Sequence, residues 1–237
     1  MLQQAPGMGD RRPRRSGDRR FAATAGAVIA FAVAMAYLES AVVVYLRAAL
    51  GLEPGAIFPL QPAESLGSFA AIELGREVAT LVMLGSIGWL VGRTALERLA
   101  WTAVAFGVWD ILYYAWLWVF IGWPPFLDTW DLLFLVPVPW VGPVWAPVVV
   151  SLALVGFGLA AARRFARGEP PTVRPWELAA GLAGGAIVIL SFTLQAGEIL
   201  AGGLPHDYPW PVFAFGMALA LAAAVSALSR RGQAASG

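Results

Sequence analysis

The sequence predicts an all-α protein, a polytopic membrane bundle of six transmembrane helices with both termini in the cytoplasm. Three observations predict this fold. Hydrophobic residues make up 59% of the 237 residues and charged residues only 13%, against roughly 25% charged residues in a typical soluble domain. The apolar runs have about the 20 residues that an α-helix needs to cross a bilayer. Basic residues are confined mostly to alternate connections between these runs.

Each expected helix coincides with one apolar run, and prolines mark the breaks between the runs. Pro54 interrupts the first connection, and Pro124 ends the third helix because proline cannot continue one. Pro143 fits the first turn of the fourth helix. Pro170 lies in the next connection, and Pro209 precedes the last helix. The expected helices cover residues 21–47, 69–92, 99–122, 143–163, 177–200 and 210–229.

The arginines indicate the orientation of the bundle, since the chain contains no lysine. Six arginines precede the first helix, and the connections after the second, fourth and sixth helices carry eight more. On the opposite side only Arg47 lies at a helix end. Basic residues favour cytoplasmic loops, so both termini are expected in the cytoplasm. We expect a membrane domain of residues 21–231 between two disordered tails, a basic one at 1–20 and a short one at 232–237.

The connection between the third and fourth helices is unusual because it combines prolines and tryptophans with no basic residue. Asp128, followed three residues later by Asp131, resembles a helix start. Tryptophan side chains favour the depth of the lipid head groups. We therefore expect a short interfacial or re-entrant helix within residues 128–142, and an aromatic interface loop without a helix is the alternative.

Several ionisable residues interrupt the apolar runs, which predicts a polar site inside the membrane. An ionisable side chain at the bilayer centre costs roughly 2.5–3.5 kcal/mol, so such groups usually face protein or water. Helical spacing places acidic residues and an arginine of the second helix on one face. The expected site comprises Glu39, Glu73, Arg76, Glu77, Asp110, Tyr113 and Tyr114, with Asp128, Asp131, Gln195 and Glu198 as secondary members.

Four of these intramembrane residues are acids, and Arg76 is the only base among them. The excess negative charge can be removed by protonation, because burial favours the neutral carboxyl form. It can be removed by a hard divalent cation bound through carboxylate oxygens, or by a polar ligand or water. A network that only joins helices is a further alternative. If a metal binds, its ligands are expected among Glu39, Glu73, Glu77 and Asp110.

The composition excludes several kinds of site and leaves three functions open. The chain has no cysteine and one histidine, which excludes cysteine-ligated metals and bis-histidine haem, and its net charge of +1 gives no reason to expect a nucleic-acid partner. The first hypothesis is binding or transport of a cation or small polar solute, with proton coupling as one variant. The second is a membrane-embedded enzyme that acts on the head group of a lipid-linked substrate at the outer leaflet. The third is a structural or assembly subunit.

Four stretches resemble an uncharacterised family of bacterial polytopic integral membrane proteins. They are YLESAVVVYLR at 37–47, IELGREVATLVML at 72–84, FGVWDILYY at 106–114 and TWDLLFLVPVPWVGPVWAP at 129–147. The resemblance covers residues 37–151, about half of the chain. It implies a multi-pass protein of the bacterial cytoplasmic (inner) membrane, and it implies no substrate, cofactor or catalytic residue.

Overall fold

The computed structural model describes residues 12–49, 51, 68–135, 137–201, 203 and 207–230. Six helices in this part of the chain are long and apolar enough to cross a membrane, which confirms the expected all-α bundle. A short helix, α7 (Ala196–Leu200), forms the end of the fifth candidate span, Pro175–Leu200. The spanning helices are α1 (Arg12–Ala49), α3 (Ser68–Val91), α4 (Ala95–Ile121), α5 (Trp145–Ala166), α6 (Pro175–Thr193) and α8 (Trp210–Ser229).

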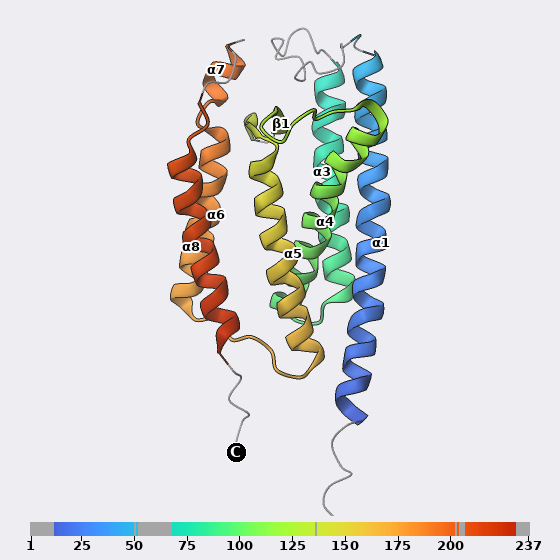
Figure 1. Ribbon diagram of the computed structural model, residues 1–237, viewed down its shortest axis with the longest axis vertical. Coiled ribbons are helices and arrows are strands. Elements are labelled where there is room, and N and C mark those ends of the chain that lie inside the picture. Colours follow the sequence, from blue (N-terminus) through green and yellow to red (C-terminus); the bar gives the residue numbers. More distant parts are fainter. Residues whose placement is uncertain are drawn as a thin grey trace, which may run out of the picture.

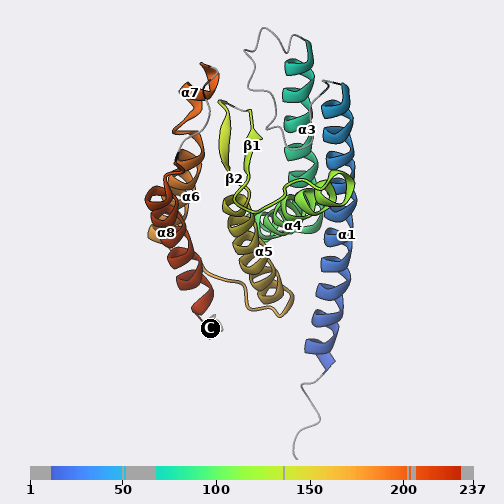
Figure 2. The same ribbon diagram turned by 45° about the horizontal axis from the view of Figure 1, so that its top comes forward.

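The helices form two groups. Helices α1, α3 and α5 all pack against α4, whereas α6 and α8 pack mainly against each other. Figures 1 and 2 show the α6–α8 pair standing apart from α1 and α3, with α5 between them. The first residues of α1 and the last residues of α8 lie at the same end of the bundle (Figure 1). We call it the arginine-rich end, and the opposite end, which carries the two strands, the hairpin end.

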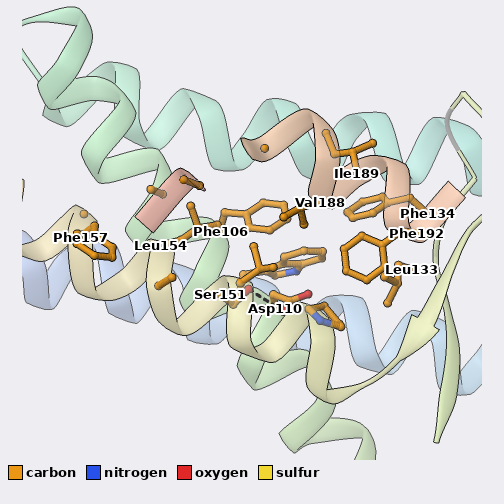
Figure 3. A pocket seen from close by; sticks show the side chains of 18 of the residues that line it. Phe106, Asp110, Leu133, Phe134, Ser151, Leu154, Phe157, Val188, Ile189 and Phe192 are labelled. Carbon is orange, nitrogen blue, oxygen red and sulfur yellow. Dashed lines mark hydrogen bonds between the residues drawn. The ribbon is translucent and has the colours of Figure 1, made fainter. Parts of the chain in front are cut away.

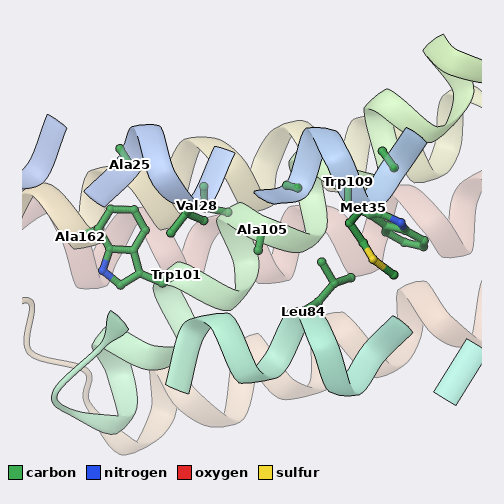
Figure 4. Close-up of a cluster of buried hydrophobic side chains, with 11 residues drawn as sticks. Ala25, Val28, Met35, Leu84, Trp101, Ala105, Trp109 and Ala162 are labelled. Carbon is green, nitrogen blue, oxygen red and sulfur yellow. The ribbon is translucent and has the colours of Figure 1, made fainter. Parts of the chain in front are cut away.

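Small and large apolar side chains alternate in the core between α1, α3 and α4 (Figure 4). Ala32 and Val104 are fully buried, and Leu84 from α3 and Trp101 from α4 are almost fully buried. Lipid tails are as apolar as these side chains, so close packing rather than burial from water holds membrane helices together. The small, fully buried side chain of Ala32 allows α1 to pack closely against α4.

Glycines bring neighbouring helices into direct backbone contact at two places. A Cβ atom at Gly107 of α4 would lie 2.5 Å from the carbonyl oxygen of Ser151 in α5, and one at Gly184 of α6 would lie 2.7 Å from the carbonyl oxygen of Gly216 in α8. A side chain at either position would therefore force its two helices apart. By contrast, a Cβ at Gly185 would meet no atom within 4 Å.

The helix expected within residues 128–142 is wrong, because this segment forms an antiparallel hairpin. Strand β1 (Trp130–Phe134) pairs with β2 (Trp140–Pro143) so that Asp131 lies opposite Gly142. Prolines at 137 and 139 would end a helix within two turns of Asp131, whereas the aromatic and β-branched residues around them favour strands. The segment between the third and fourth spans is therefore a hairpin.

Several further boundaries differ from expectation. Pro143, expected in the first turn of the fourth helix, ends β2 instead, and α5 begins at Trp145. Helix α1 begins at Arg12, so the part of the expected disordered tail at 12–20 is helical, whereas residues 1–11 and the tail at 232–237 lie outside the described residues. The fifth expected helix is divided into α6 and α7, which are separated by a turn at Leu194 and Gln195. The turn lets the polar end of the fifth span, α7, run in a different direction from α6.

Candidate functional site

A cavity of about 640 Å³ lies between the two groups of helices. Its lining extends from Arg47 and Trp123 near the hairpin end to Glu177 and Leu228 near the arginine-rich end. Figure 3 shows Phe106, Leu154, Phe157 and Val188 along its wall, with Asp110 and Ser151 beside them. The cavity therefore joins a polar region to a longer apolar one. The seven expected site residues, Glu39, Glu73, Arg76, Glu77, Asp110, Tyr113 and Tyr114, all line it.

Arg76 joins the carboxylates of two helices. Its guanidinium group forms ion pairs with Glu39 of α1 and with Glu73, one turn earlier in α3. Thr80, one turn further along α3, donates a hydrogen bond from its hydroxyl to Glu39 at 3.0 Å. Glu39 is 6% exposed, so its charge depends on these partners. Helical spacing thus places the acidic residues and Arg76 of α3 on one face, as the sequence predicts, and Arg76 and Thr80 on this face both contact Glu39 of α1.

Glu77 connects the same stripe to the hairpin. Its carboxylate accepts a hydrogen bond from the backbone N–H of Leu135, at 2.9 Å from one oxygen and 3.1 Å from the other. Leu135 directly follows β1, whose pairing register with β2 shifts between Leu132 and Phe134. Glu77 is therefore a side-chain anchor for an irregular stretch of backbone.

Asp110 lies deeper in the bundle than the glutamates and is held by α5. The hydroxyl of Ser151 donates to its carboxylate at 2.8 Å, and both residues are buried. This bond forms at the level where Gly107 brings α4 and α5 into contact. One neutral donor does not balance a carboxylate charge, so the bond from Ser151 alone leaves the buried charge of an ionised Asp110 uncompensated.

Asp131 joins the site from the hairpin, as a secondary member that the sequence placed only in a connection. The hydroxyl of Tyr114 donates to its carboxylate at 2.9 Å. Burial raises the pKa of Asp131 to about 7, although the Tyr114 bond and the charge of Arg47 act in the opposite direction. Arg47 itself lies over the ring of Trp123, 5.8 Å from its centroid. The hairpin end of the site can therefore change its charge near neutral pH.

The other secondary residues lie elsewhere. Asp128 is exposed and does not line the cavity. Gln195 donates from its side chain to the backbone carbonyl of Asp207 at 3.0 Å, and Glu198 is exposed in α7. These three residues are thus at the hairpin end of the molecule but outside the cavity lining.

Two features of the site were missed in the sequence. Glu177, expected only as the start of the fifth helix, is buried and lines the cavity near the arginine-rich end. It pairs with Arg230 and accepts a hydrogen bond from Ser226, both at the end of α8. Glu177 lies three residues after Arg174, and Pro175 lies between them, which is the pattern of a helix start. In the sequence this pattern explains Glu177 fully, so its pairing with the end of α8 could not be seen. The grouping of aromatic rings around Asp110, such as the contacts of Trp109 with Phe106 and Tyr113, was also not expected.

The site does not offer a ready metal centre. Within the part of the chain that the structure describes, no three His, Asp or Glu side chains are grouped so that they could hold a metal ion. Arg76 lies between Glu39 and Glu73 and forms ion pairs with both. The observed partners therefore favour protonation or a polar ligand over the hard divalent cation considered from the sequence.

Comparison with protein-family models, with curated proteins and with solved structures finds no match to this chain. The resemblance to uncharacterised bacterial membrane proteins is untested by these comparisons and stays an expectation. What the fold does establish is an integral membrane protein with six candidate spans, whose environment is a lipid bilayer.

Proposed function

We propose that this protein binds an amphiphilic, lipid-like molecule within the membrane. The polar head of the molecule would lie among the carboxylates and Arg76 near the hairpin end, and its apolar chain would lie along the cavity toward the arginine-rich end. The observation that carries the proposal is the continuity of one cavity from the polar cluster into a long apolar lining.

The apolar lining favours an amphiphile over a small polar solute or a bare cation. Beyond the polar cluster, the wall consists largely of aliphatic, aromatic and small side chains, among them Phe106, Leu154, Phe157, Val188 and Ala220. A small polar ligand gains nothing from such a surface. An acyl or isoprenoid chain fits it, because the chain replaces lipid tails that would otherwise fill the space.

The polar cluster must then supply the selectivity. A lipid chain that moves from the bilayer into the cavity exchanges one apolar environment for another, so little free energy is gained by its burial. Hydrogen bonds and ion pairs to the head group do add free energy of binding, because bulk lipid offers no such partners at that depth. If the arginine-rich end faces the cytoplasm, as the positive-inside rule predicts, the head group comes from the outer leaflet.

Blocking the apolar part of the cavity tests the proposal without touching the polar cluster. Gly185 lines the cavity, and a side chain there would meet open space. A leucine at this position (Gly185→Leu) should fill the cavity, leave the fold intact and reduce the binding of a dioleoyl phospholipid to the delipidated protein by about tenfold or more. Native mass spectrometry in detergent would measure the bound fraction.

Gly156→Leu is the matched control. Gly156 is also a mid-helix glycine with open space around its Cβ position, but it does not line the cavity. It should bind the phospholipid as the unmodified protein does. Equal binding by Gly185→Leu and Gly156→Leu would overturn the proposed function.

A further inference from the structure

We propose that the head group of this amphiphile carries an ammonium group together with an oxygen acceptor, as the head group of an aminophospholipid does. This inference rests on the proposed function and names the chemistry that the polar cluster selects. Three independent features of the cavity lining support it: the charge of the cluster, the aromatic side chains around Asp110 and the indole groups without hydrogen-bond partners.

The charge of the cluster favours a cation. Five carboxyl groups and two guanidinium groups line the hairpin end of the cavity, so acidic groups outnumber basic groups there by three. Arg76 is already shared between Glu39 and Glu73. An anionic head group would lie close to these acidic groups, and Arg76 could not balance its charge without giving up its ion pairs with the two glutamates. The charged residues concerned are Glu39, Arg47, Glu73, Arg76, Glu77, Asp110 and Asp131.

Aromatic rings surround the same part of the cavity. Trp109 lies 5.4 Å from Phe106 and 6.2 Å from Tyr113 between ring centroids, and Phe134 of the hairpin lies 5.5 Å from Trp140. All five rings line the cavity together with Asp110. Aromatic faces attract ammonium groups, and the attraction is largest where water is excluded. Carboxylates beside aromatic rings are thus the combination that recognises an ammonium cation.

The indole groups supply the second half of the recognition. Trp109 and Trp123 are 6% and 4% exposed, and Trp140 is half-buried. Among the described residues, the buried indole N–H groups of all three have no hydrogen-bond acceptor, and all three rings line the cavity. A buried donor without a partner costs about 1–3 kcal/mol, so native structures rarely keep one. A phosphate or ester oxygen of the ligand could accept from them after small side-chain adjustments.

The test compares lipids that share their chains and differ in the head group. Delipidated protein in detergent is titrated with dioleoyl phosphatidylethanolamine and with dioleoyl phosphatidylglycerol, and native mass spectrometry gives the affinity for each. We expect the ethanolamine lipid to bind about tenfold tighter or more. In Asp110→Asn and in Glu77→Gln this ratio should fall to about threefold or less, because each change removes one carboxylate charge.

The outcomes separate this inference from the proposed function. Equal or tighter binding of the glycerol lipid to the unmodified protein would overturn the inference, and this comparison needs no variant to fold. An unchanged ratio in both carboxylate variants would also overturn it, since the ratio within one variant is independent of the fraction that is folded. If Gly185→Leu meanwhile loses both lipids equally, the apolar chain site stands and only the head-group assignment fails. If Gly185→Leu keeps both lipids, the proposed function fails first.

Discussion

Replacing Asp131 by asparagine should remove most of the pH dependence of the free energy that opens the hairpin away from α4. Asp131 has a pKa of about 7 in the folded protein, against 3.8 for an aspartate in water. Burial is the main cause, and Asp131 is 8% exposed. The folded hairpin therefore holds the proton more tightly than the opened hairpin does. Its stability is greatest below the pKa of the opened state and falls as the pH rises from about 4 to about 7.

The size of this effect follows from the two pKa values. A rise from 3.8 to about 7, at 1.36 kcal/mol per unit, corresponds to about 4 kcal/mol at most. Water that reaches the hairpin would reduce the value. Above neutral pH no further loss from this group is expected, because Asp131 is then ionised in both states.

Amide hydrogen exchange at the hairpin measures the effect directly. After correction for the intrinsic exchange rate, the opening free energy of β1 and β2 should fall between pH 4 and pH 7 by about 2–4 kcal/mol in the unmodified protein. In Asp131→Asn it should be nearly constant, whereas in Asp128→Asn, an exposed control on the same segment, it should fall as before. A hairpin in Asp131→Asn that keeps the full pH dependence would refute the assignment of this titration to Asp131.

Three other perturbations follow from the packing. Arg76→Gln leaves two glutamates without their cation and should lower the free energy of unfolding by about 3–5 kcal/mol. Adding Glu39→Gln to this variant should restore part of the loss. Strictly additive losses of the two changes in thermal unfolding would contradict a direct ion pair. Gly107→Ala should lower the free energy of unfolding by about 1–3 kcal/mol, because its Cβ would lie 2.5 Å from a backbone oxygen of α5. Its melting temperature should fall accordingly, whereas that of Gly156→Ala should not. Glu177→Gln should weaken the contact between the start of α6 and the end of α8. Amide hydrogen exchange should then become faster in the last turn of α8 and stay unchanged elsewhere.

The spans and their polar stripes could be predicted from the sequence because both depend on the bilayer. A lipid environment requires long apolar runs and makes each buried charge conspicuous, so Glu39, Arg76 and Asp110 stand out against their neighbours. Helical spacing then says which residues share a face. The partners across helix interfaces could not be predicted in the same way. Ser151 and Leu135 are ordinary residues in the sequence, and only the packing of α5 and the hairpin brings them to Asp110 and Glu77.

The hairpin shows where local signals mislead. Asp128 and Asp131 have the spacing of a helix start, but the carboxylate of Asp131 accepts a hydrogen bond from Tyr114, 17 residues away in α4, and no helix forms. Prolines after β1 and the pairing of Trp130 with Pro143 decide the conformation instead. The aromatic rings around Asp110 were equally hidden, because tryptophan in a membrane protein is expected at the lipid interface and their grouping depends on where the hairpin folds back.

The polar bonds of the site also hold the fold together, and this determines which variants can separate binding from stability. Glu39 with Arg76 joins α1 to α3, Asp110 joins α4 to α5, and Glu77 joins α3 to the segment after β1. A carboxylate variant that loses binding could therefore have lost either the head-group contact or the packing between two elements. Gly185 differs from all of them, because its Cβ position meets no protein atom and faces the cavity. A leucine there removes space for the ligand and removes no contact of the protein, so a purely structural role for the site predicts that Gly185→Leu has no effect on lipid binding.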